Sequence, residues 1–233
     1  MNTQTLSQKP VGEIVAGDYR TAQVLRSHGL DFCCGGGRTL EKACASKKID
    51  LEEVVSELAA LDMADNTEDN YNEWSLDFLT DYIVNNHHSF VRKMLPEISF
   101  YAEKVARVHG ERDPELLDIL QNVRLLRSEM MGHLQKEEEE LFPQIKELVT
   151  QKKTGSVKAA IVEALEEEHD KAGELMAKIE ELTNGFNPPE NACASYRVLF
   201  QNLEGFQEDL HKHVHLENNI LFPKALKLEK SLN

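Results

Sequence analysis

The chain has 233 residues, 41% of them hydrophobic, which is enough for one substantial domain and a smaller one. Its formal net charge is -15, and no run of Lys and Arg could follow a phosphate backbone, which argues against binding to nucleic acid or to an anionic membrane. The polar N-terminus lacks the apolar stretch of a signal peptide, no later segment approaches membrane-spanning length, and four unevenly spread cysteines are too few for a secreted disulfide scaffold. We therefore expect a soluble, cytoplasmic protein.

Residues 1–61 are predicted to form a small helical domain. One helix is expected over residues 19–28, before Gly29, and another over residues 51–58, after a capping aspartate. Between them lies the sequence Cys-Cys-Gly-Gly-Gly at residues 33–37. It cannot be regular helix, because consecutive glycines favour loop conformations, so both thiols are expected on an exposed loop.

Residues 62–74 are polar, acidic and aperiodic, as is typical of a linker, and the second domain is expected at residues 75–233. Four long amphipathic patterns follow, and Pro96 is expected to bend the first rather than divide it. Four long helices joined by short connections predict an up-and-down four-helix bundle with ligand sites in its core. The predicted helices run from Ser75 to about His109, from Asp113-Pro114 to about Pro143, from about Val157 to Leu182, and from beyond residue 191 to about Pro223.

A short pattern occurs twice, eighty residues apart. His133 is followed four residues later by Glu137 and then by Leu-Phe-Pro, and His213 is followed in the same way by Glu217 and Leu-Phe-Pro. The Leu-Phe-Pro is expected to close each helical segment. A spacing of four places His and Glu on one face of a helix, where both can reach one metal ion or an adjacent pair.

Each motif is preceded, on the previous predicted helix, by another histidine at a similar distance: forty-five residues in the first half and forty-four in the second. Four His and two Glu suit two metal ions, each with two imidazoles and both bridged by the carboxylates. Nitrogen and oxygen ligands without thiolate favour iron or manganese over structural zinc, and a bridged pair favours iron. The predicted metal ligands are His88, His133, Glu137, His169, His213 and Glu217.

Other interpretations are open at these positions. A single inward-facing His is usually a hydrogen-bonded core residue, and a run of four glutamates such as residues 137–140 is ordinarily a solvated face. The repeat in register favours ligands, because burying six polar groups is costly unless they bind something. His87 could replace His88, which we prefer for its place on the apolar stripe. Three neighbours could surround the ligands or lie on the surface: Glu138, Glu167 and His215.

The sequence around these ligands resembles a known family. The segments Glu-Glu-His-Asp-Lys-Ala-Gly-Glu around His169 and Asn-Asn-Ile-Leu-Phe-Pro after Glu217, together with His88 and the first motif, are similar to the hemerythrin-like domain of the di-iron iron–sulfur cluster repair proteins. The stretch Phe-Cys-Cys-Gly-Gly-Gly is similar to the small N-terminal domain of that family. The resemblance implies two non-haem iron ions in an oxo- or hydroxo-bridged centre. It also implies the repair of iron–sulfur clusters damaged by nitric oxide or oxidants, with the damaged proteins as clients.

The third predicted helix differs from that of an oxygen carrier. Oxygen-carrying hemerythrins have a further His four residues from the first, whereas Leu165 and Gly173 occupy the positions four before and four after His169. One ligand fewer would leave labile positions on the ions, which suits catalysis or iron donation. Ferritin-type bundles are disfavoured because they use Glu-x-x-His. The main expectation is repair by iron donation or redox chemistry; an oxygen or nitric oxide sensor and a nitric oxide reductase are alternatives, and whether the protein is an enzyme stays open.

The cysteines have two interpretations. Adjacent residues cannot form a four-thiolate cluster site, and the spacing of Cys44 and Cys193 does not complete one. Cys33 and Cys34 are either inert loop thiols or, if backbone amides of the glycine-rich loop lower a thiol pKa, redox-active thiols or transient iron ligands. A homodimer is a further hypothesis, because the short N-terminal segment would bury little core alone.

Overall fold

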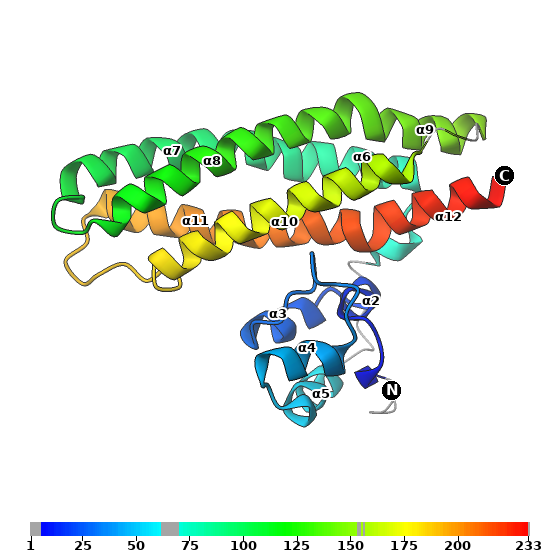
Figure 1. Ribbon diagram of the computed structural model, residues 1–233, viewed down its shortest axis with the longest axis horizontal. Helices are drawn as coiled ribbons and strands as arrows, with labels where there is room; N and C mark the ends of the chain where they lie inside the picture. Colours follow the sequence, from blue (N-terminus) through cyan, green and yellow to red (C-terminus); the bar gives the residue numbers. More distant parts are fainter. Residues whose placement is uncertain (1–5, 62–69, 153–154, 156, 233) are drawn as a thin grey trace.

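The computed structural model describes residues 6–61, 70–152, 155 and 157–232. Within these ranges the regular structure is helical and no residue belongs to a β-strand, which confirms the predicted all-α fold. Figure 1 shows a long bundle of helices with a small helical domain packed against one side of it. None of the described helices is long and apolar enough to cross a membrane.

The small domain contains short helices packed around their apolar faces. Two of them lie where the sequence predicts helices, and the side chain of Asp50 caps the later one by accepting a hydrogen bond from the amide of Glu52. The other two are not predicted from the sequence: α2 has no side-chain cap to mark its start, and the capping side chain of Thr39 was the available signal for α4. The helices are α2 (Val11–Gly17), α3 (Thr21–Ser27), α4 (Leu40–Lys47) and α5 (Leu51–Ala60), of which α3 and α5 were predicted.

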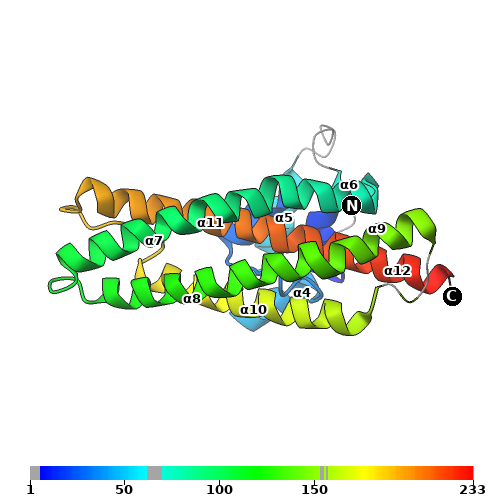
Figure 2. The ribbon, with the colours of Figure 1, turned by 90° about the horizontal axis from the view of Figure 1, so that it is seen from above.

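Four long helical rods form the bundle, as predicted, and three of them contain a π-helical turn, a feature often found at functional sites. Figure 2 shows the rods running side by side along the bundle. The rods are α6–η3–α7 (Leu76–Ile83, Val84–His88, Ser89–His109), α8–η4–α9 (Glu115–Lys136, Glu137–Leu141, Phe142–Gln151), α10 (Ala159–Leu182) and α11–η5–α12 (Ala194–Leu216, Glu217–Leu221, Phe222–Leu232).

The two Leu-Phe-Pro segments do not end their helices, contrary to the prediction. Each proline lies in the first turn of a further helix, α9 or α12, where the missing proline amide needs no partner. The preceding π-turn changes the hydrogen-bond pattern, so that the Phe142 amide bonds to the carbonyl of Glu137 and the Phe222 amide to that of Glu217. The proline therefore marks a π-turn here rather than a helix end.

The end of the predicted linker belongs to the folded structure. Residues Tyr71–Glu73 form the short helix η2, and Tyr71 is buried against Trp74, with 4.8 Å between the ring centroids. The side chain of Asn72 donates a hydrogen bond to the carbonyl of Ala16 in the small domain. Residues 62–69, which make up the rest of the predicted linker, lie outside the described residues.

A polar layer divides the bundle core into two apolar clusters. One cluster lies at the end formed by α6, α9 and α12 and includes Leu79, Ile145 and Leu221. The other includes Leu95 and Leu126 from α7 and α8 and continues into the core of the small domain. Because both clusters are closely packed, the polar side chains between them are held in fixed positions.

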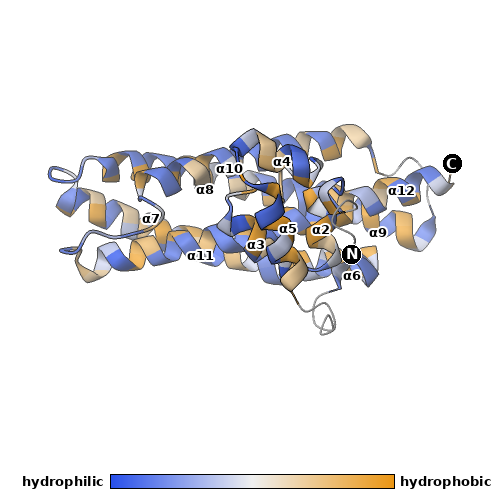
Figure 3. Ribbon diagram, turned by 90° about the horizontal axis from the view of Figure 1, so that it is seen from below, coloured by the Kyte–Doolittle hydropathy of each residue, from blue (hydrophilic) through white to orange (hydrophobic). Residues whose placement is uncertain are grey.

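The small domain docks on the π-turn η5 through its cysteine-containing loop. The amide of the Asn219 side chain donates to the carbonyls of Phe32 and Cys33, both at 3.2 Å. Gly12 and Gly36 allow this approach, since a Cβ at either position would lie 2.1 or 2.2 Å from Asn219 Oδ1. Figure 3, which views the molecule from this side, shows the small domain lying over α10 and α11.

Candidate metal centre

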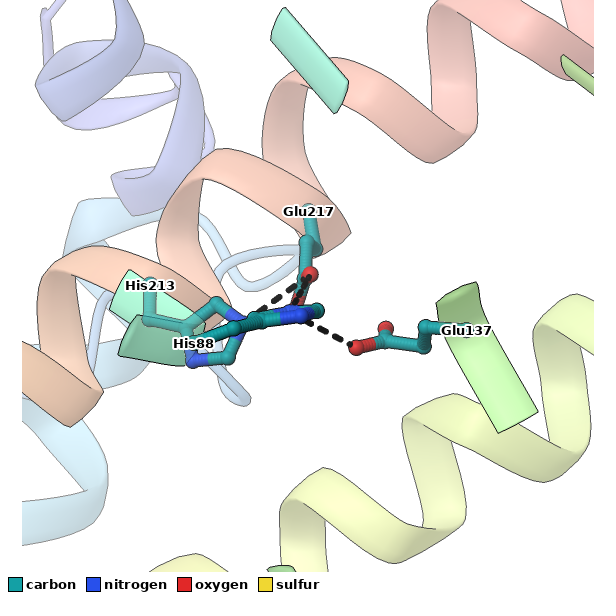
Figure 4. A group of neighbouring side chains, drawn as sticks. All are labelled: His88, Glu137, His213 and Glu217. Atoms are coloured by element: carbon teal, nitrogen blue, oxygen red, sulfur yellow. Dashed lines mark hydrogen bonds and ion pairs between the residues drawn. The ribbon is translucent and has the colours of Figure 1, made fainter. Parts of the chain in front are cut away.

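Six polar side chains meet in the polar layer, and they are the six predicted metal ligands. All are buried, with exposed fractions between 0% and 3%. The π-turns supply three of them, since His88 ends η3 while Glu137 and Glu217 begin η4 and η5. Figure 4 shows His88 and His213 close to the two glutamates, whose carboxylates point into the same space from opposite rods. The other two of the six, which Figure 4 does not draw, are His133 and His169.

The two glutamates lie between two pairs of histidines. Glu137 Oε2 is 3.3 Å from Nε2 of both His88 and His133. Glu217 Oε2 is 3.2 Å from Nε2 of His169, and its Oε1 is 3.0 Å from Nε2 of His213. Two groups of four potential ligands result, one with His88 and His213 and the other with His133 and His169, and both groups include the two glutamates. Either carboxylate can thus serve two ions.

Several donor atoms of the site have no hydrogen-bond partner, although Nε2 of His213 bonds to Oε1 of Glu217 at 3.0 Å. Both oxygens of Glu137, Oε2 of Glu217 and Nε2 of His88 are buried without a hydrogen bond to any described residue. Nε2 of His133 and Nε2 of His169 face each other at 2.9 Å. Two nitrogens bound at right angles to one metal ion, each about 2.1 Å from it, would lie ~3.0 Å apart. Since unpartnered buried polar groups are costly, the residues present fit a metal site.

The carboxylates also determine where protons reside. Burial lowers the pKa of His88, but Glu137 and Glu217 overcome this and raise it to about 10. His133 behaves alike: burial lowers its pKa, and the charge of Glu137 raises it to about 9. Burial raises the pKa of the Glu217 carboxyl, but three surrounding imidazoles, first His213, hold it well below its usual value. A cation that enters the site must therefore displace protons from imidazole.

Three of the four imidazoles form a hydrogen bond on their outer side through Nδ1, which fixes the tautomer and turns Nε2 to the centre. Nδ1 of His213, in contrast, is buried with no hydrogen-bond partner in the described part of the chain. The two outer partners that are glutamates each also pair with a cation: Glu138 with Arg92, and Glu168 with Lys136. The pairs are His88 with Glu138 at 2.6 Å, His133 with Glu168 at 3.0 Å and His169 with Asn218 at 2.8 Å.

The phenylalanines of the two Leu-Phe-Pro segments cover the site. Phe142 stacks on His88 with 5.6 Å between the ring centroids, and Phe222 stacks on His169 at 6.1 Å. In each hairpin, the Phe of the second rod therefore covers the His of the first rod. Both phenylalanines are almost completely buried, so they separate the donor atoms from water. This arrangement accounts for the repetition of Leu-Phe-Pro with the ligand motif.

The structure also places the neighbours whose role the sequence leaves open. His87 points away from the six ligands, since its Nδ1 bonds to Asp209 at 2.9 Å, although its ring stacks on His213 at 5.5 Å. His215 is buried on the other face of α11, against Phe32 of the small domain.

Of the two glutamates left open, Glu138 contacts a candidate ligand and Glu167 is exposed. Glu168 and Asn218 were missed in the sequence analysis. Each bonds to a histidine on another rod, and such contacts produce no regular spacing between the two residues in the sequence. The only signal is that each adjoins a predicted ligand in the chain.

The cysteine loop is organised by Asp31. Its carboxylate accepts hydrogen bonds from the amides of Cys33, Cys34 and Gly35 at 2.9, 3.1 and 2.9 Å. The suggestion that these amides lower a thiol pKa does not hold for Cys33, because interaction with the Cys34 side chain, and burial, raise its pKa well above the usual value. Cys34 is partly exposed, and no described cysteine is in a disulfide.

The sequence matches two family models. Residues 79–225 match a model described as the hemerythrin HHE cation binding domain, and residues 7–62 match one described as a domain of unknown function. The chain is also similar to proteins named iron–sulfur cluster repair protein YtfE. That of Cronobacter sakazakii is 38% identical over 222 residues, which cover 95% of this chain and 98% of the relative. Those of Yersinia pestis and Escherichia coli are 35% identical over 219 and 218 residues, each covering 94% of this chain and 97% or 96% of the relative. The chain belongs to this repair family.

Membership of the repair family confirms the resemblance read from the sequence. The match to the cation-binding domain spans all six candidate ligands, from His88 to Glu217, and the match to the second model spans the cysteine loop. The family assignment thus rests on both domains, and it agrees with a metal site at the polar layer of the bundle.

Proposed function

We propose that this protein repairs iron–sulfur clusters damaged by oxidative or nitrosative stress, by holding two iron ions at the six-residue site and donating iron to the damaged proteins. The relatives carry the name of repair proteins, and the bundle matches a cation-binding domain. The observation that carries the proposal is that two groups of four ligands share the fully buried carboxylates of Glu137 and Glu217. Bound iron would supply Lewis-acid and one-electron redox chemistry at this point.

The donor set suits iron that is to be released. It consists of imidazole and carboxylate without thiolate, which favours iron or manganese over structural zinc. Each group offers four ligands, fewer than the six that an octahedral ion takes up. The positions that could add a histidine on α10 do not: Leu165 lies in the apolar core, and Gly173 lies beside Cys34.

The imidazoles can exchange iron for protons. The pKa of His88 is raised to about 10 and that of His133 to about 9. Both imidazoles are therefore cationic near neutral pH, with a proton on each ring nitrogen, when no metal cation balances the glutamates. Departure of an iron ion would therefore be accompanied by proton uptake at Nε2 of these residues. The protons keep the buried carboxylates neutralised, which lowers the cost of release.

The partners we propose are damaged iron–sulfur proteins, in the cytoplasm. The described cysteines are free thiols, which suits a reducing compartment. A homodimer remains a separate prediction, and light scattering on the purified full chain tests it.

The decisive experiment combines metal analysis with a repair assay. The full chain is purified without oxygen, its iron content is measured, and it is added to a dehydratase whose cluster has been destroyed by nitric oxide. We expect about two iron ions per chain and recovery of dehydratase activity. Glu137→Ala and Glu217→Ala should lose both. Glu140→Ala is the matched control, because Glu140 lies in the same acidic run but is exposed.

The same experiment separates the alternatives. A reversible oxygen or nitric oxide adduct without recovery of the dehydratase would favour a gas sensor. Continuous consumption of nitric oxide with an electron donor would favour a reductase. Full repair by both glutamate variants would overturn the proposal.

A further inference from the structure

A cleft lies between the two domains, and His169 is the one candidate metal ligand among the residues that line it. Its volume is about 840 Å³, within the range of roughly 300 to 1,000 Å³ typical of small-molecule sites. One wall is the cysteine loop of the small domain and the other is formed by α10 and α11. Figure 3 views the side of the bundle on which these elements meet. The cleft is thus large enough for a tripeptide-sized ligand.

The two walls carry opposite charge. The small domain contributes three cations and one carboxylate, whereas α10 contributes carboxylates alone: Arg26, Arg38, Lys47 and Asp31 on the first wall, and Asp170, Glu174 and Glu180 on the second. Among the described residues, the side chains of Arg38, Asp170 and Glu174 have no hydrogen bond or ion pair, and all three are exposed. A zwitterionic ligand could place a carboxylate against the first wall and an ammonium group against the second.

A thiol lies between these walls. Cys34 lines the cleft and is partly exposed, and it lies beside α10, where a Cβ at Gly173 would be 3.7 Å from its sulfur. Its neighbour Cys33 is only 7% exposed, and the Cys33 thiol donates to Asp31 Oδ1 at 3.2 Å. Both cysteines line the cleft, but Cys34 is the more exposed of the two and the thiol of Cys33 is engaged by Asp31.

We propose that the cleft binds a small zwitterionic peptide disulfide of the glutathione class and that Cys34 exchanges with it. The Cys34 thiolate attacks one sulfur of the bound disulfide, a mixed disulfide with Cys34 forms, and the second half leaves as a thiolate, which takes up the proton that Cys34 gave up. No further oxidant is needed, since one S–S bond breaks as another forms: the leaving sulfur is reduced and the sulfur of Cys34 is oxidised. The mixed disulfide persists, because the Cys33 thiol is buried and donates its proton to Asp31, so it does not act as an attacking thiolate.

The test compares two disulfides on the full chain. Glutathione disulfide carries carboxylates and ammonium groups, whereas cystamine carries ammonium groups alone. Peptide mass spectrometry follows the modification of Cys34, and Cys193, which is exposed and does not line the cleft, is the internal reference. We expect glutathione disulfide to modify Cys34 faster than Cys193, and cystamine to show no such preference.

Variants of the two walls test charge recognition. Arg38→Ala should lower the rate at Cys34 with glutathione disulfide about two- to fivefold, the range expected for one exposed ion pair, and leave the rate with cystamine unchanged. Lys171→Ala is the matched control, because Lys171 is an exposed cation on α10 that does not line the cleft.

Three results would overturn the proposal. They are the same preference for Cys34 over Cys193 with both disulfides, no effect of Arg38→Ala on the rate with glutathione disulfide, or a Cys33–Cys34 disulfide without an adduct. Iron content and repair measured on Arg38→Ala keep this outcome separate from the proposed function, since Arg38 does not touch the metal site.

Discussion

His169 Nδ1 donates a hydrogen bond to Asn218 Oδ1 at 2.8 Å, across two rods of the bundle. Asn218 stands between Glu217, which faces the candidate metal site, and Asn219, which bonds to the cysteine loop. Because consecutive residues on a helix point about 100° apart, one turn reaches three neighbours at once. The π-turn η5 thus connects the metal site, one of its histidines and the small domain.

The Asn218–His169 bond predicts a loss of metal affinity in Asn218→Ala. Without the acceptor, the imidazole is free to rotate and its tautomer is no longer fixed, so iron should bind about 10- to 100-fold more weakly. Asn218→Asp keeps an acceptor and should bind nearly as tightly as the natural protein. Competition with an iron chelator under anaerobic conditions measures both.

Asn202→Ala is the control for this prediction, since the one side-chain hydrogen bond of Asn202 to a described residue is a long surface contact with Glu97. If Asn218→Ala and Asn202→Ala bound iron equally well, the orienting role of Asn218 would be refuted.

Asn219 predicts a separate effect on the small domain. Asn219→Ala removes two hydrogen bonds to the cysteine loop but no group that faces the metal site. Loss of buried bonds of this kind costs about 1–3 kcal/mol, so the loop should exchange its amide hydrogens faster while iron content stays the same. Hydrogen exchange followed by mass spectrometry measures residues 32–38 directly.

Gly36→Ala tests the same contact from the other side, because its added Cβ would lie 2.2 Å from Asn219 Oδ1. It should loosen the loop as Asn219→Ala does, whereas Gly37→Ala, with open space around it, should loosen it less. Unchanged exchange in both Asn219→Ala and Gly36→Ala would show that the docking contact does not hold the loop.

Much of the fold and the candidate ligands could be predicted because they follow repeating patterns. The long rods have a helical hydrophobic period, and the spacing of His88 to His133 matches that of His169 to His213. The helical period also favours His88 over His87, because His88 lies on the apolar stripe of its helix. The short helices show too little of a period, and those predicted have a boundary signal instead: a glycine follows α3 and an aspartate caps α5, whereas α2 has no side-chain cap.

The π-turns and the outer partners could not be predicted, and the reason is physical. A π-turn shifts the helical face by one residue, and proline in the sequence indicates a helix end more often than a widened turn. Glu168 and Asn218 act across rods, so their partners depend on packing rather than on spacing. The docking of Cys33 on Asn219 likewise depends on how the domains meet.

The raised pKa values of His88 and His133 predict that iron binding depends strongly on pH. Values of about 10 and about 9 mean that both imidazoles are cationic at neutral pH before a metal ion binds, with a proton on each ring nitrogen. A ligating Nε2 cannot keep its proton. Binding therefore releases protons, and iron affinity should rise at least about tenfold per pH unit from pH 6.5 to 8.5. Calorimetry in two buffers of different ionisation enthalpy counts the protons released.

Glu140→Ala should show the same pH dependence as the natural protein, since the exposed Glu140 does not contact the site. Iron affinity that does not change over this range, with no proton release, would contradict the assigned protonation of His88 and His133.

The stacking of Phe222 on His169 predicts a large cost for its removal. Phe222→Ala deletes a fully buried ring and opens a cavity beside the polar layer, so the free energy of unfolding should fall by about 3–5 kcal/mol. Phe100→Ala, at a position that is 60% exposed, should change it by no more than about 0.5 kcal/mol. Denaturant unfolding measures both.

A second variant separates the two roles of the ring, because Phe222→Leu keeps the site dry while removing the stack. If Phe222→Leu lost iron as readily as Phe222→Ala, the ring itself would be needed to position His169, whereas retention of iron by Phe222→Leu alone would show that exclusion of water is what the phenylalanine contributes.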